Sequence, residues 1–276
     1  MRRLMTLLAA LLMASHAMAQ SSGYRATAWI TTAAAQVRLI VPEAFKAGEA
    51  VHGGIEVQLE PGAKTYWRSP GETGVAPALD LSASRGLKTG AMLFPAPVAF
   101  DDGAGGIAVG YTESLIFPLS LTSEGLAPAV LSVQFDFGVC HRNMCMPAAA
   151  SFIVKPGEGE ADTALNRRMA DWLARVPLRS GHPVLSVSAL RETRAGEVLT
   201  LGVEARAPAA GEPSLFVEAD GLSFTTRRLG PSNDGIHRFE AVSALTADHA
   251  GRPTGPVTLT LVAGGIAIEQ TMTPAR

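Results

Sequence analysis

The chain is most informative in three neighbouring segments: Val133-Gln134-Phe135-Asp136-Phe137, Cys140-His141-Arg142-Asn143-Met144-Cys145-Met146-Pro147 and Ser151-Phe152-Ile153-Val154-Lys155. The first alternates apolar and polar residues like a half-buried strand, and the third is a second strand-like run. The segment between them therefore predicts a short hairpin connection, and it contains the only two cysteines among 276 residues. Cysteines at the inner ends of such a hairpin face each other at roughly 5.5 Å between Cα atoms, which suits a disulfide.

The first 19 residues have the features of a secretory signal peptide. Arg2 and Arg3 form a charged start, an apolar stretch runs from Leu4 to Met13, and the small residues around Ala17 and Ala19 mark a cleavage site before Gln20. The apolar stretch is shorter than the roughly 20 residues that a membrane-spanning helix needs. We therefore expect export to an oxidising compartment such as a bacterial periplasm, where a close cysteine pair forms a disulfide, and no insertion into the membrane.

The charge of the chain argues against two classes of partner. Its formal net charge is −2, which becomes −4 once Arg2 and Arg3 leave with the signal peptide. A chain of this charge gives no basis for binding nucleic acid or an anionic membrane surface. The 28 glycines and 18 prolines lie scattered between short apolar runs, a pattern typical of many short strands joined by tight turns.

The chain divides into two strand-rich regions, so we predict an all-β protein in which an immunoglobulin-like sandwich precedes a second, smaller one. The first region, residues 20–159, contains strand patterns at 37–41, 53–59, 65–67, 115–119 and 129–137. The second region, residues 183–276, contains strand patterns at 184–189, 198–205, 214–218, 238–241 and 257–263. The second region offers no reactive group, so we expect it to act as a spacer or a docking module.

The segment between these regions, residues 160–182, predicts a short connecting helix. Five apolar residues recur at helical spacing and form a face that packs against one or both sandwiches: Leu165, Met169, Trp172, Leu173 and Val176. Asp162 is placed to cap the start of this helix, and Pro177 to end it.

An ordered set of motifs runs through the first region. Tyr66-Trp67-Arg68-Ser69-Pro70-Gly71-Glu72-Thr73-Gly74 is followed by Phe94-Pro95-Ala96-Pro97, then by Gly110-Tyr111, and then by the cysteine hairpin ending at Met146-Pro147. Over about residues 36–156 this set resembles the N-terminal periplasmic domain of DsbD-type thiol:disulfide interchange proteins, including relatives linked to copper tolerance.

The resemblance implies an immunoglobulin-like sandwich that works as a component of protein-disulfide reduction. Its cysteine pair, Cys140 and Cys145, would take electrons from a thioredoxin-like protein or domain and pass them to a periplasmic disulfide isomerase or reductase, without a cofactor. Full-length members continue into a membrane segment and a thioredoxin-like domain. This chain ends at Arg276 with neither, so we expect its electron donor to be another protein. Such members also shield the cysteines with a mobile loop carrying an aromatic residue, for which no residue here matches by motif.

The two cysteines are the candidate catalytic residues because exchange needs one thiolate to attack and a neighbour to resolve the mixed disulfide. Arg142 and a protonated His141 would favour a thiolate. The resemblance assigns the bond with the partner to Cys145, the cysteine before Met146-Pro147, and Cys140 would then be the more enclosed, resolving thiol. Tyr66 and Trp67 are expected to shape a turn and fill the sandwich end, or to shield the sulfurs.

Two alternative functions remain open from the sequence. Cys140, His141, Met144, Cys145 and Met146 form a cluster of soft ligands suited to copper(I), which would make the chain a periplasmic copper-binding or copper-tolerance protein. Alternatively, the disulfide is structural and the sandwich is a non-catalytic adaptor. A bridge closing so short a loop stabilises a fold by only about 2 kcal/mol, which favours a redox or metal role over the structural one.

Overall fold

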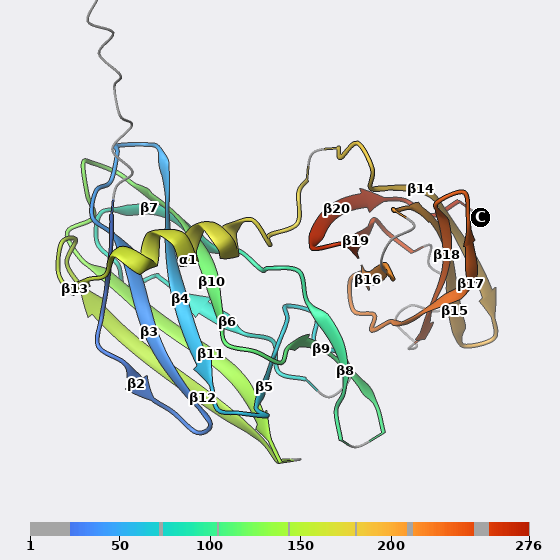
Figure 1. Ribbon diagram of the computed structural model, residues 1–276, viewed down its shortest axis with the longest axis horizontal. Helices are drawn as coiled ribbons and strands as arrows, with labels where there is room; N and C mark the ends of the chain where they lie inside the picture. The colour runs from blue at the N-terminus through green and yellow to red at the C-terminus, as the bar shows by residue number, and fades with distance from the viewer. Residues whose placement is uncertain are drawn as a thin grey trace, which may run out of the picture.

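The computed structural model describes residues 23–71, 74–103, 105–142, 144–179, 181–208, 212–245 and 254–275, and the predicted signal peptide lies outside these ranges. Figure 1 shows two β-sandwiches, with one helix lying along the first and leading toward the second. The all-β fold with a short helix is confirmed. Among the described residues, no helix is long and apolar enough to cross a membrane.

The first sandwich consists of two antiparallel sheets. One sheet has the order β13 (Glu160–Ala161), β1 (Tyr24–Ala26), β3 (Ala35–Pro42), β4 (Ala50–Leu59), β10 (Leu115–Ser123) and β7 (Leu87–Met92), with β2 (Ile30–Thr31) beside β3. The other has the order β12 (Met144–Val154), β11 (Leu131–His141), β5 (Lys64–Tyr66), β9 (Ile107–Tyr111) and β8 (Val98–Asp101), with β6 (Ala78–Asp80) beside β11. The cysteine hairpin therefore forms one edge of the second sheet, because β12 is its edge strand.

The core between these sheets is built by alternation along their strands. Leu39 of β3 and Ile55 of β4 face inward from one sheet, and Phe135 and Phe137 of β11 face them from the other. Because successive side chains of a strand point to opposite faces, the residues between these positions lie outside this core. On β11 this alternation places Cys140 on the outer face of its sheet, next to the inward-facing Val139.

Helix α1 (Thr163–Leu173) covers the outer face of the sheet that contains β1 and β10. Its Leu165 and Met169 are fully buried against Ile40 and Ile116. The Asp162 side chain accepts a hydrogen bond from the Ala164 N–H, so the predicted cap is confirmed. The helix ends at Leu173, three residues before the expected Val176, and it packs as part of the first sandwich.

The second sandwich pairs a four-stranded sheet with a three-stranded one. Their orders are β14 (Ser186–Ala195), β15 (Val198–Arg206), β18 (Ile236–Ala244) and β17 (Thr225–Asn233), and then β16 (Ser214–Glu218), β19 (Val257–Ala263) and β20 (Ile266–Met272). Leucine and valine side chains from both sheets form a core separate from that of the first sandwich. β17 and β20 carry no strand pattern that we detected in the sequence.

The two sandwiches are in direct contact through Arg68. Its Nε donates to Oε1 of Glu218 at 2.9 Å and its Nη2 donates to Oε2 of Glu218 at 2.6 Å, while Nη2 also bonds Glu269. Phe216 of β16 is only 6% exposed and joins the first core, with its ring centroid 5.8 Å from that of Trp67. The second sandwich is thus fixed against the first by a charged contact and an apolar one.

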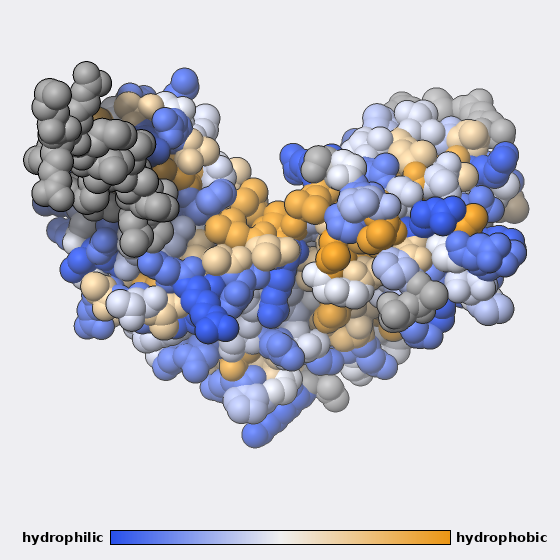
Figure 2. Space-filling view, turned by 45° about the horizontal axis from the view of Figure 1, so that its top comes forward, coloured by the Kyte–Doolittle hydropathy of each residue, from blue (hydrophilic) through white to orange (hydrophobic). Residues whose placement is uncertain are grey.

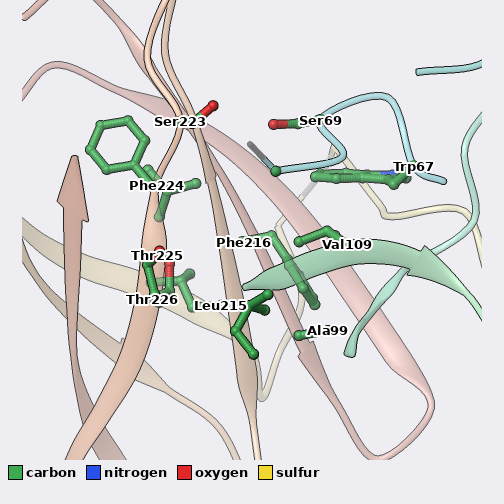
Figure 3. Close-up of a pocket in the computed structure, with 13 residues that line it drawn as sticks. Trp67, Ser69, Ala99, Val109, Leu215, Phe216, Ser223, Phe224, Thr225 and Thr226 are labelled. Atoms are coloured by element: carbon green, nitrogen blue, oxygen red, sulfur yellow. The ribbon is translucent and has the colours of Figure 1, made fainter. Parts of the chain in front are cut away.

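A small pocket remains between the sandwiches beside this contact. Figure 3 shows Trp67 and Val109 of the first sandwich around it, with Leu215 and Phe224 of the second. Figure 2 shows a notch between the two lobes in which hydrophobic side chains gather. The connecting segment also pairs with β20, because the Leu178 N–H donates to the Ala267 carbonyl and the Glu269 N–H donates to the Leu178 carbonyl, both at 2.9 Å.

Candidate functional site

The site is centred on a disulfide between directly opposite residues of β11 and β12. Cys140 pairs with Cys145, and their Cα atoms are 4.0 Å apart. This separation is shorter than the expected 5.5 Å because it belongs to the closer, non-hydrogen-bonded kind of antiparallel pair, for which about 4.5 Å is typical. The pair lies one step from the turn, where His141 faces Met144 and Arg142 has the positive φ of 50° that a two-residue hairpin loop requires.

The two sulfurs differ in their exposure. Cys140 is 9% exposed because it packs in a cluster with Tyr66, Ala108 and Phe100 on the outer face of the sheet. Cys145 is exposed because β12 is the edge strand. A large partner can therefore reach Cys145 more easily than Cys140, and this asymmetry agrees with the enclosure expected from the sequence.

The Tyr66 hydroxyl lies beside both sulfurs, 2.6 Å from Sγ of Cys140 and 3.3 Å from Sγ of Cys145. The Tyr66 ring is 2% exposed and lies over Gly138, where a Cβ atom would come within 2.9 Å of the ring. Burial, together with the nearby negative charge of Asp102, raises the pKa of Tyr66 above its usual value. The hydroxyl thus keeps its proton at neutral pH and can donate it in a hydrogen bond to sulfur.

Phe100 of β8 covers the other side of this tyrosine. The two ring centroids are 6.4 Å apart, and Phe100 packs against the small cluster formed by Tyr66, Ala108 and Cys140. The sequence reasoning missed this residue because β8 was not predicted. The available signal was a hairpin, since Val98-Ala99-Phe100-Asp101 and Ile107-Ala108-Val109 flank a glycine-rich connection.

A pocket opens on the side of Cys140 that faces away from Cys145. Its lining residues come from β5 and the turn before it, from the end of β8 and the residue after it, and from the end of β11 and its turn: Pro61, Gly62, Lys64, Tyr66, Phe100, Asp102, Cys140, His141 and Arg142. Lys64 Nζ donates to the Asp101 carbonyl at 2.9 Å and lies 4.9 Å from the centroid of the Phe100 ring. Asp102 accepts a hydrogen bond from the Gly106 N–H at 2.9 Å.

The structure separates the residues of the alternative copper site. Along the regular β11–β12 ladder the cysteines share one face, while His141, Met144 and Met146 fall on the pairs that point to the other face. His141 Nδ1 lies 3.5 Å from Glu60 Oε2. Among the residues that the structure describes, no group of three histidine, cysteine or acidic side chains is arranged to hold a metal ion. A copper site using all five residues would require the hairpin to rearrange.

The first sandwich is packed in part by two other pieces of the sequence motifs, Trp67 and the Phe94-Pro95-Ala96-Pro97 segment. Trp67 is 1% exposed and belongs to the first core, so it fills the sandwich as expected and does not contact the sulfurs. The Phe94-Pro95-Ala96-Pro97 segment crosses between strands, with the Pro95 carbonyl accepting from the Tyr111 hydroxyl at 2.8 Å. The Ala96 N–H donates to the Arg175 carbonyl at 2.8 Å, which ties this segment to the end of α1.

The fold and the site together define a β-sandwich domain that presents a disulfide on its edge strand, with one enclosed and one exposed sulfur. Residues 36–156 match the family described as the N-terminal domain of the thiol:disulfide interchange protein DsbD. This match confirms the resemblance expected from the motifs, and it covers the first sandwich and not the second. No curated protein shows significant similarity to the chain.

Proposed function

We propose that this chain is a periplasmic thiol:disulfide interchange protein that passes electrons through Cys140 and Cys145. The observation that carries the proposal is the disulfide itself, formed between neighbouring strands at a sheet edge, with Cys145 exposed and Cys140 enclosed under Tyr66. The family of the first sandwich supports the reaction type. The export signal in the sequence and the family support the compartment.

In the reducing half of the cycle, a thiolate of a thioredoxin-like donor attacks Sγ of Cys145. The disulfide breaks, a mixed disulfide forms, and Cys140 leaves as a thiolate. Tyr66 stabilises the charge that develops on Cys140, because its hydroxyl already lies 2.6 Å from that sulfur. The second thiol of the donor then displaces Cys145, which leaves the donor oxidised and this protein as a dithiol.

In the second half of the cycle, the reduced protein attacks the disulfide of an acceptor such as a periplasmic isomerase or reductase. Cys145 forms the mixed disulfide, and Cys140 resolves it by attacking Cys145 Sγ and releasing the acceptor as a dithiol. Phe100 and Tyr66 cover the enclosed sulfur between these steps. We assign to Phe100 the aromatic shielding role that the sequence left without a residue.

Trapping experiments test the assignment of the two sulfurs. The Cys140→Ala variant retains the exposed thiol and should accumulate a mixed disulfide with a thioredoxin-like partner, whereas Cys145→Ala should not. Trapping with the roles reversed would overturn the assignment and leave exchange intact. If neither variant traps a partner and the reduced protein binds copper(I), the copper function replaces this proposal.

A redox titration tests the structural alternative. A purely structural bridge in a secreted protein resists reduction to potentials below about −300 mV. We expect the Cys140–Cys145 pair to equilibrate at a less negative potential, read from free thiols in buffers of defined potential. A midpoint below that limit would identify the bridge as a structural disulfide.

A further inference from the structure

Lys64, Cys140 and Cys145 lie in one row across three strands of the sheet. Cys145 of β12 is the direct partner of Cys140 of β11, and Cys140 is in turn the direct partner of Lys64 of β5. The axis of the disulfide, extended from Cys145 through Cys140, therefore continues over Lys64. The pocket that contains Lys64, Tyr66 and Arg142 lies at this end of the row.

This row matters because a thiolate displaces a sulfur along the axis of the disulfide bond. A nucleophile that attacks Cys145 arrives from the open edge of the sheet. A nucleophile that attacks Cys140 must arrive from the opposite end, through the pocket over Lys64. The two sulfurs thus have separate approaches, one open and one confined between Tyr66, Phe100 and the hairpin turn.

The confined approach selects by size and by charge. Cys140 is only 9% exposed, so the pocket excludes a folded partner and admits a small molecule. Lys64 and Arg142 contribute two positive charges to the lining, and Asp102 contributes one negative charge. Glu60, 3.5 Å from His141, carries a further negative charge but is not one of the lining residues. The lining itself carries one more positive than negative charge, whereas the chain as a whole is negative.

We propose, resting on the proposed function, that this pocket admits small thiols carrying carboxylate groups and directs them to Cys140. The thiolate attacks Sγ of Cys140, the bond to Cys145 breaks, and Cys145 leaves as a thiolate exposed to water at the sheet edge. A second small thiol then attacks the sulfur of the first, releasing Cys140 and a small disulfide. Two thiols supply the two electrons, so the protein gains a dithiol without a protein donor.

Charge-matched probes test this proposal in the full-length protein. The wild-type disulfide is reduced with 3-mercaptopropionate, 2-mercaptoethanol or cysteamine, the reaction is quenched with acid, and the mixed disulfide is located by peptide mass. We expect the anionic thiol to be found on Cys140. Its location on Cys145 would overturn the proposal.

Single-cysteine variants distinguish the effect of the pocket on the reaction rate from the intrinsic reactivity of each probe. Cys145→Ser reports on Cys140, and Cys140→Ser is the matched control that reports on Cys145. Each reacts with the anionic, neutral and cationic symmetrical disulfides of the same three probes. We expect the anionic-to-cationic rate ratio to be about threefold or more higher at Cys140, and to fall toward that at Cys145 in 1 M salt. Equal ratios at both sulfurs would overturn the proposal.

Two substitutions at Lys64 assign the charge effect to the pocket. In the Cys145→Ser background, Lys64→Gln should lower the anionic-to-cationic ratio, whereas Lys64→Arg should keep it, provided that both variants melt like their parent. An unchanged ratio in a folded Lys64→Gln variant would overturn the proposal. A thioredoxin-like donor assayed on the wild type tests the proposed function independently, because that partner uses Cys145.

Discussion

Removing the Tyr66 hydroxyl should slow disulfide exchange without weakening the fold. In the Tyr66→Phe variant the ring keeps its packing over Gly138 and beside Phe100, and only the contacts of 2.6 Å and 3.3 Å to the two sulfurs are lost. A hydrogen bond to a charged group contributes about 1.5–3 kcal/mol. Because this bond is made to the departing Cys140 thiolate, its loss should reduce the rate of exchange by about ten- to a hundredfold.

The assay is stopped-flow reduction by a thioredoxin-like donor, compared with a matched variant. Tyr111→Phe also removes a buried tyrosine hydroxyl, but one that donates to the Pro95 carbonyl and does not reach the sulfurs. That variant should lose stability, by about 1–3 kcal/mol for the unsatisfied carbonyl, and keep its exchange rate. If both variants exchange at the wild-type rate, or slow equally, the role assigned to Tyr66 is wrong.

Three further predictions concern the scaffold and the bond. Gly110→Ala should destabilise the protein by about 1–3 kcal/mol, because its Cβ would lie 2.0 Å from the Thr65 carbonyl oxygen. The control is Gly202→Ala, whose Cβ would meet open space, and equal melting temperatures of the two variants would contradict the predicted clash. A fragment ending at residue 179 should be more stable than one ending at Gly159, because only the longer one retains α1 and the burial of Leu165 and Met169, worth about 1.5–3 kcal/mol each; equal unfolding free energies would refute the helix as part of the first sandwich. Intact mass before and after reduction and alkylation should show no free thiol in freshly purified protein, and two alkylated thiols without prior reduction would contradict the disulfide.

The local pattern of the sequence was sufficient to predict the structure of segments whose conformation depends on their own residues. The strand ranges 214–218 and 257–263 were predicted as the structure has them, because their apolar residues alternate or run continuously within one buried strand. The helix was recognisable from its apolar spacing and from Asp162. The cysteine hairpin was predictable because both strands and the connection between them are contiguous.

What the sequence left open depends on contacts between distant residues. Tyr66 contacts Cys140, 74 positions further along the chain, because β5 pairs with β11. No local sequence pattern predicts that pairing. Arg68 meets Glu218 across 150 positions, so the fixed contact between the sandwiches was equally hidden. Strand β8 was not predicted because its largely exposed residues do not alternate between apolar and polar, and Phe100 was therefore missed as well.

The β11–β12 ladder also determines how little the protein must change when it is reduced. The strands stay paired from Leu131 and Val154 to His141 and Met144, so the sulfurs are held as neighbours whether or not they are bonded. Breaking the bond therefore frees almost no chain, because the paired backbone already closes the same short loop. Under the proposed function, the cysteine pair would store two electrons, and its oxidised and reduced forms would share one backbone conformation. Proteases, which cut unfolded segments, would then have no basis for distinguishing the oxidised form from the reduced one.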